Sequence, residues 1–169
     1  MLIVFSGLPG TGKTTLAREL AASRSTAYLR IDIIEQTIRN AQVLAADIGP
    51  AGYNVALALA ETNLAIGRIV IADCVNPVAE SRMAWRATAE RAKSSIFDIE
   101  VICSDPMEHQ RRVEARTSDV PGLTVPTWLS VQQHEYEPWF MKRLVVDTAI
   151  LSPSKALSLI ELHLDGNGN

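Results

Sequence analysis

The sequence is poor in cysteine and has no long apolar run. Its two cysteines, Cys74 and Cys103, form no CxxC pair and have no histidine at ligand spacing, so neither a disulfide framework nor a zinc site is indicated. No stretch approaches the ~18 to 20 apolar residues of a membrane span. The apolar start at residues 2–5 is too short for a signal peptide and lacks a basic flank. We therefore expect no membrane association and a cytoplasmic location.

An excess of positive charge is also absent. Sixteen lysines and arginines stand against 19 aspartates and glutamates, which leaves a formal charge of -3 and no surplus of cations to neutralise a DNA duplex. A dedicated duplex-DNA binder is therefore not expected. With 169 residues, of which 47% are hydrophobic and 21% charged, the chain has the size and composition of one folded domain rather than a disordered segment.

Short apolar runs alternate with longer amphipathic ones, which is typical of α/β units with a parallel sheet. Strands are expected at residues 2–6, 27–31, 68–72, 96–103 and 143–146. Helices are expected at residues 13–23, 33–41, 54–66, 78–93, 106–117 and 153–163. The turn-rich segment 118–126 is predicted to be a loop, and 165–169 a frayed tail. A single domain over residues 1–164 follows.

Four of the five expected strands run into an aspartate: Asp32, Asp73, Asp105 and Asp147. Ligands of open parallel sheets bind outside the carboxyl ends of the strands. Asp105, with Pro106 after it and Glu108 three residues on, has the pattern of a helix N-cap. The same local pattern leaves a capping role open for Asp32. Asp73 is followed by Cys-Val-Asn-Pro, which is not a helix start, so capping explains it less well.

Residues 7–14 match the P-loop pattern G-x-x-x-x-G-K-[ST], between an apolar run and a helix. Backbone N–H groups of such a loop form an anion-binding concavity at the positive end of a helix dipole. Lys13 would lie between the β- and γ-phosphates of ATP, and the Thr14 hydroxyl would be a ligand of Mg²⁺. The predicted nucleotide-binding residues are Gly7, Pro9, Gly10, Thr11, Gly12, Lys13, Thr14 and Thr15.

A P-loop alone does not separate kinases from GTPases or motor ATPases. The guanine-specifying sequence N-K-x-D is absent, and the rest of the chain is short for the added helical domain of a ring-forming ATPase. A compact phosphotransferase is the simplest fit.

The sequence resembles the small P-loop kinase superfamily, in the AAA-labelled branch that is similar to gluconate kinases, chloramphenicol phosphotransferases, zeta toxins and polynucleotide kinase domains. The resemblance rests on GLPGTGKTT near the start and on segments 30–39, 67–85, 105–116 and 126–139. It implies a three-layer α/β/α P-loop NTPase fold with a five-stranded parallel sheet. It further implies a short lid at about 106–138, with ATP and Mg²⁺ as cofactors.

The resemblance also implies roles for individual residues. Asp32 matches the proposed general base that contacts the acceptor hydroxyl. Asp73 matches the Walker B aspartate, which would hold Mg²⁺ through a water. Arg39 would hold an anionic part of the acceptor or be a solvated helix residue. Arg82, taken as exposed, would touch substrate or phosphate.

The cluster Arg111, Arg112 and Arg116 resembles the lid arginines of these kinases, with Arg112 and Arg116 on one helix face. Catalytic roles at the transferring phosphoryl group and a stacking contact with adenine are expected from this pair, whereas an ion pair with Glu108 is the structural alternative for Arg112. Trp128, His134, Tyr136 and Trp139 either line the acceptor pocket or pack the lid. His109 and His163 lie on predicted helices, and no functional role is expected for either.

The expected function is transfer of the γ-phosphate of ATP to a hydroxyl of a small or nucleoside-like acceptor, by a monomer or homodimer. Two alternatives stay open at this point: an ATP-binding switch that acts through a protein partner, and a nucleic-acid 5′-end kinase.

Overall fold

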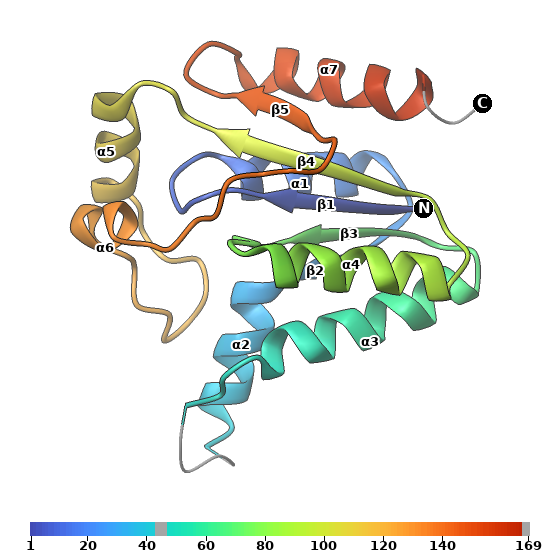
Figure 1. Ribbon diagram of the computed structural model, residues 1–169. Helices are drawn as coiled ribbons and strands as arrows, with labels where there is room; N and C mark the ends of the chain where they lie inside the picture. The colour runs from blue at the N-terminus through green and yellow to red at the C-terminus, as the bar shows by residue number, and fades with distance from the viewer. Residues whose placement is uncertain (43–46, 167–169) are drawn as a thin grey trace.

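A computed structural model describes residues 1–42 and 47–166 of the chain. Strands and helices alternate along it, and five strands form one sheet in the order β2-β3-β1-β4-β5, with all neighbouring pairs parallel (Figure 1). The strands are β1 (Leu2–Ser6), β2 (Thr26–Arg30), β3 (Ile69–Asp73), β4 (Ile96–Ile102) and β5 (Leu144–Asp147). The five expected strands and the parallel sheet are confirmed.

Helices cover both faces of the sheet. They are α1 (Lys13–Ser23), α2 (Ile31–Asn40), α3 (Ala51–Ala65), α4 (Ala79–Arg91), α5 (Pro106–Glu114), α6 (Trp128–Gln132) and α7 (Pro153–Gly166). The fold is thus the three-layer α/β/α P-loop kinase fold. Among the described residues, no helix is both long and apolar enough to cross a membrane.

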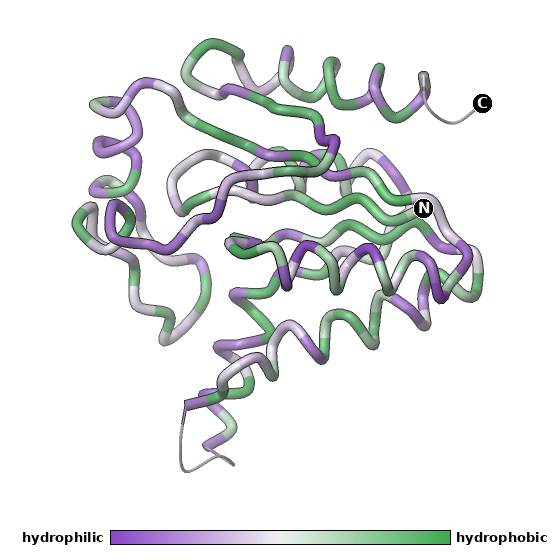
Figure 2. Tube along the Cα trace, in the orientation of Figure 1, coloured by the Kyte–Doolittle hydropathy of each residue, from purple (hydrophilic) through white to green (hydrophobic). Residues whose placement is uncertain are grey.

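Strand alternation builds two separate cores. Ile3 and Phe5 of β1 pack with α1 and α7, whereas Leu2 and Val4 pack on the other face with α3 and α4, around the buried Trp85. The hydrophobic colour in Figure 2 runs along the central strands, while α5 beyond the sheet edge is largely hydrophilic. The sheet is therefore held by burial on both faces, and α5 lies outside this core.

Most differences from the expected elements are boundary shifts. β2 ends at Arg30, so Asp32 lies in the first turn of α2 instead of directly after a strand. The short helix α6 is not expected from the sequence. α7 continues through Gly166, so the expected frayed tail at 165–169 begins in a helix, and residues 167–169 are outside the described part of the chain.

The register of the sheet aligns three functional segments at its carboxyl edge. Phe5, near the end of β1, is opposite Asp73 of β3, and Arg30 of β2 is opposite the same Asp73. The loop between β1 and α1 leaves the sheet beside this row. Residues 30, 73 and the P-loop are therefore brought together by backbone pairing.

Candidate active site

The P-loop backbone requires glycine at the positions that the motif specifies. Gly7 and Gly10 have φ angles of 144° and 86°. A Cβ on Gly7 would lie 2.3 Å from the Val101 carbonyl oxygen, and one on Gly10 would lie 2.5 Å from Cγ2 of Val113. These positions exclude side chains by both backbone conformation and space. The loop leads directly into α1, whose first residue is Lys13.

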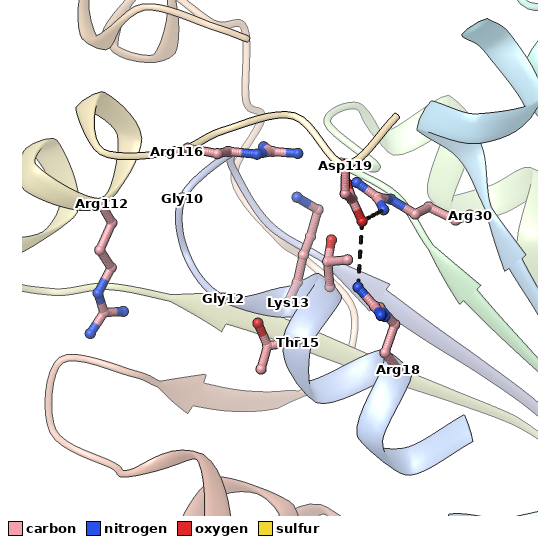
Figure 3. Close-up of a pocket in the computed structure, with 10 residues that line it drawn as sticks. Gly10, Gly12, Lys13, Thr15, Arg18, Arg30, Arg112, Arg116 and Asp119 are labelled. Carbon is pink, nitrogen blue, oxygen red and sulfur yellow. Dashed lines mark hydrogen bonds and ion pairs between the residues drawn. The ribbon is translucent and has the colours of Figure 1, made fainter. Parts of the chain in front are cut away.

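A cavity of about 400 Å³ opens at this loop (Figure 3). Its lining residues are Gly10, Gly12, Lys13, Thr14, Thr15, Arg18, Arg30, Arg112, Arg116 and Asp119. Five of them are cationic and one is a carboxylate, so the cavity suits an anionic ligand such as a polyphosphate. Of the other predicted nucleotide-binding residues, Gly7, Pro9 and Thr11 shape the loop without lining the cavity, and the Thr11 hydroxyl donates to the Leu8 carbonyl at 2.9 Å.

A second hollow, of about 220 Å³, lies on the β5 side of the P-loop. It is lined by Gly12, Thr15, Leu16, Arg112, Thr148, Leu151 and Pro153. Arg112 donates to the hydroxyl and the carbonyl of Thr148 at 2.8 and 3.0 Å, and the Thr148 hydroxyl donates to the Thr11 carbonyl at 2.7 Å. Arg112 therefore borders both hollows, and Thr148 ties it to the P-loop.

Carboxylates and arginines alternate on the opposite, β2 side. Arg30 lies 2.8 Å from Asp119, 3.8 Å from Asp32 and 3.9 Å from Asp73. Arg116 lies 3.7 Å from Asp32, so Asp32 has a guanidinium on either side. The structure thus brings Asp32 close to Arg116. Arg116 lines the cavity and Asp32 does not, and the catalytic roles expected of both stay predictions.

Asp73 is almost fully buried and is oriented by its neighbours. The Tyr28 hydroxyl donates to its Oδ2 at 2.8 Å, and Arg30 Nε approaches the same oxygen. Burial, and then the charge of Asp73, raise the pKa of Tyr28 well above its ordinary value, which keeps the phenol protonated as a donor.

The donor set fits a magnesium ion that is held mainly by a nucleotide. Thr14 lines the cavity in the first turn of α1, and Asp73 ends the neighbouring β3. The described residues contain no cluster of three or more metal-ligating side chains. Mg²⁺ usually keeps several waters and takes one or two protein ligands plus substrate phosphates, so a hydroxyl and a carboxylate suffice.

The side chains that sequence reasoning missed are Arg18, Arg30, Asp119 and Thr148. Asp119 accepts hydrogen bonds from Arg30 at 2.8 Å and Arg18 at 3.4 Å, and the bond from Arg30 lowers the pKa of Asp119 below its ordinary value. Arg30 is the first residue of segment 30–39, on which the resemblance rests, and lies two residues before Asp32. Its position could therefore have indicated a place in the site. Nothing local in the segment 118–126 identifies Asp119, because its partners are 89 and 101 residues away.

Arg39 does not line the P-loop cavity. Its half-exposed side chain lies 3.4 Å from Glu35, one helical turn earlier, so the solvated-helix alternative describes it better than contact with an acceptor. Arg111 is similar, because it is exposed and pairs with Glu108 at 2.6 Å. Hydrogen bonds from Arg111 and Arg112 lower the pKa of Glu108 to about 2.

The expectation that Arg82 is exposed and touches substrate is wrong. Its side chain is fully buried, and it donates to the carbonyls of Pro77, Glu137 and Pro138 at 2.8, 2.8 and 3.0 Å. The guanidinium lies 4.1 Å from the Trp139 ring centroid and 5.1 Å from that of Tyr136. Arg82 fastens the segment after α6 to α4, and the packing alternative holds for these two aromatic residues.

His109 has partners that the sequence does not reveal. Its Nε2 lies 2.8 Å from the Pro9 carbonyl oxygen in the P-loop, and its ring contacts Trp128 edge to face at 5.2 Å. Trp128 of α6 thus packs against α5, and α5 contacts the P-loop through His109.

The fold and the glycine-rich loop at the carboxyl edge of the sheet define a P-loop protein with a three-layer α/β/α fold. The model of the AAA domain family matches residues 2–134, and the chain belongs to that family. No curated protein matches the chain in sequence.

Solved structures share the fold over almost the whole chain. A candidate kinase from Chloroflexus aurantiacus has a TM-score of 0.74 at 19% identity and covers 98% of this chain and 96% of its own. A sugar kinase from a Janibacter species has a TM-score of 0.70 at 17% identity, with coverage of 97% and 94%. Kti12 from Chaetomium thermophilum, in complex with ADP-AlF3, has a TM-score of 0.67 at 21% identity, with coverage of 100% of both chains.

Proposed function

We propose that the protein is an ATP-dependent, Mg²⁺-requiring phosphotransferase that moves the γ-phosphate of ATP to a hydroxyl group of a small acceptor. The observation that carries this proposal is the arrangement of two unlike sites on either side of the P-loop. A partly apolar hollow at Thr148, Leu151 and Pro153 suits a nucleotide base. The acidic and basic cluster around Asp32 lies on the other side, where an acceptor would enter.

The nucleotide would be held by the P-loop and the lid. Backbone N–H groups of residues 7–15 and the Lys13 ammonium bind the phosphates, and Arg112 reaches the nucleotide from the β5 side. Thr14 and Asp73 would hold Mg²⁺, which would neutralise charge on the phosphate oxygens.

The transfer step assigns Asp32 and Arg116 separate tasks. The acceptor oxygen forms a bond to the γ-phosphorus, while the bond from that phosphorus to the β–γ bridging oxygen breaks and its electron pair leaves with ADP. The acceptor's hydroxyl proton passes to the Asp32 carboxylate. Arg116, 3.7 Å from Asp32 and on the rim of the same cavity, stabilises charge on the phosphoryl group in transit.

A second candidate function is an ATP-binding switch that acts through a protein partner. The similarity to Kti12 over the full length of both chains fits this candidate, because the structure of that relative holds ADP-AlF3. In this case the cavity would bind and hydrolyse ATP with water as the only acceptor.

Transfer of label from γ-³²P-ATP to a pool of small metabolites tests the proposal. Lys13→Ala should abolish nucleotide binding and transfer. Asp32→Asn should leave the Kd for ATP nearly unchanged and lower transfer by about 100-fold or more, because it removes the general base. Asp165→Asn, at the far end of α7, is the matched control and should retain full transfer.

Two outcomes would overturn the assignment. Undiminished transfer by the Asp32→Asn protein removes Asp32 from the mechanism. Hydrolysis of ATP without transfer to any metabolite, accelerated by a protein partner, supports the switch instead.

A further inference from the structure

Two arginines from different elements converge on one carboxylate oxygen in the P-loop cavity. Arg18 of α1 and Arg30 at the end of β2 donate to Oδ2 of Asp119 at 3.4 and 2.8 Å (Figure 3). This is the geometry by which guanidinium groups bind an oxyanion. Here the oxyanion belongs to the protein itself.

The arginine and the carboxylate are not anchored equally. The Arg30 side chain is 4% exposed, and its strand is paired with β3 along its length. Asp119 is 50% exposed and lies on the irregular segment between α5 and α6. The buried Arg30 Nε faces Asp73 at 3.9 Å, whereas Nη1 donates to Asp119. Arg30 is therefore held by the sheet. Arg18, which is 61% exposed on α1, and Asp119 on its irregular segment are both free to move.

Arg18 and Arg30 lie away from the hollow that we propose holds the base of the nucleotide. Arg112 and Thr148 mark the β5 side of the P-loop, whereas Arg30 ends β2 at the opposite edge of the sheet, beside Asp32. In Figure 3, Arg112 points away from Lys13, while Arg18 and Arg30 point toward Asp119. Lys13, Arg112 and the backbone N–H groups of the P-loop would bind the nucleotide. Arg18 and Arg30 would then be available to bind the acceptor.

Asp119 also lines a further hollow, which lies against α2. Its volume is about 300 Å³, and it is lined by Ile33, Gln36, Thr37, Asn40, Asp119, Val120 and Pro121. Within residues 1–42 and 47–166, Asp119 alone lines both this hollow and the P-loop cavity. A ligand whose body occupied the hollow against α2 would meet Arg18 and Arg30 only by taking the place of the Asp119 carboxylate.

We propose that the phosphoryl acceptor carries an anionic group, a carboxylate or a phosphate, and that Arg18 and Arg30 bind this group in place of Asp119. That the bound anion is a phosphoryl acceptor rests on the proposed function. That Arg18 and Arg30 bind an anion rests on their positions alone. Asp119 is an internal counter-ion that keeps the two arginines paired until the acceptor arrives. Asp119 is anionic at neutral pH, as an aspartate of ordinary pKa already is, so a ligand anion competes with it directly.

Binding of inorganic phosphate to protein saturated with Mg²⁺ and AMP-PNP tests the inference, because the nucleotide blocks the P-loop. Equilibrium dialysis with labelled phosphate gives the Kd. Asp119→Asn should tighten phosphate binding by about tenfold, since a competing charge is removed, and Arg18→Gln should weaken it by about tenfold. Arg24→Gln is the matched control, because Arg24 makes a similar ion pair, at 3.3 Å with Asp165, beyond the other end of α1.

The outcomes separate this inference from the proposed function. If AMP-PNP binds but phosphate binding is the same in the wild-type, Asp119→Asn and Arg18→Gln proteins, the anion site is refuted, and Asp119 only fastens its loop. If AMP-PNP does not bind, the proposed function fails. The phosphate titration is then repeated on Lys13→Ala protein with and without Arg18→Gln, and equal affinities there refute the anion site.

Discussion

Arg111 and Arg112 are sequence neighbours with different surroundings. Both donate to Glu108, but only Arg112 also reaches Thr148 and the two hollows at the P-loop. Arg112→Gln should weaken ATP binding by about tenfold, because charge-assisted hydrogen bonds are lost at the nucleotide. Arg111→Gln should change the Kd by no more than about twofold, since its ion pair is exposed. Titration with a fluorescent ATP analogue measures both, and equal effects would count against a nucleotide role for Arg112.

The sequence reveals site residues to the extent that their signals are local. The P-loop residues follow one motif, and Asp105 has its N-cap pattern within three residues; the structure confirms that cap, with the Asp105 carboxylate accepting from the N–H groups of Met107 and Glu108. Asp119 and Thr148 have no such pattern. Their roles depend on contacts with Arg30 and Arg112 that span 89 and 36 residues, and these form only when the sheet is assembled.

At the scale of elements, strand and helix type could be predicted where periodicity is sustained, and boundaries could not. The β2–α2 boundary moves because Ile31 and Asp32 continue directly into a helix without a connecting loop. α6 has five residues, too few to show a helical period, and the Thr127 hydroxyl that caps it gives only a weak signal.

Helix α4 carries a buried anchor for the segment that follows α6. Arg82→Leu should lower the free energy of unfolding by about 3 kcal/mol or more, because several buried carbonyls lose their donor together with two aromatic contacts. Met83→Ala, at the exposed neighbouring position, should change it by less than about 0.5 kcal/mol. Urea denaturation provides the comparison. A small effect of Arg82→Leu would mean that water replaces the guanidinium without loss.

The segment that we expect to be the lid, residues 106–138, contacts the P-loop but contributes no side chain to either hydrophobic core described above. His109 meets the Pro9 carbonyl, and the Val113 side chain lies over Gly10. Such peripheral elements open at lower free energy than core strands. Nucleotide binding between α1 and α5 would therefore order the lid more than the body of the molecule.

At the scale of the whole molecule, this argument predicts the pattern of amide hydrogen exchange. Mg²⁺ with AMP-PNP at ~100 times its Kd should stabilise the fold by about 2.7 kcal/mol and slow exchange most in α1 and α5. Removing Mg²⁺ with EDTA should abolish most of this protection. Helix α3 serves as the internal reference, because it packs against α2 and α4 away from the P-loop. Equal protection of α3 and α5 would contradict a distinct lid.

The pairing of Phe5 with Asp73 limits how the geometry of this site can change. Positions along a parallel strand come in steps of about 3.3 Å, and each single step turns the side chain to the opposite face. A slip of one residue in β3 would therefore point the carboxylate of Asp73 into the other helix layer rather than shift it slightly. The sheet therefore allows the distance between the P-loop and Asp73 to change only in whole-residue steps. Small changes in which acceptor is bound must come from α2, α5 and the segment around Asp119.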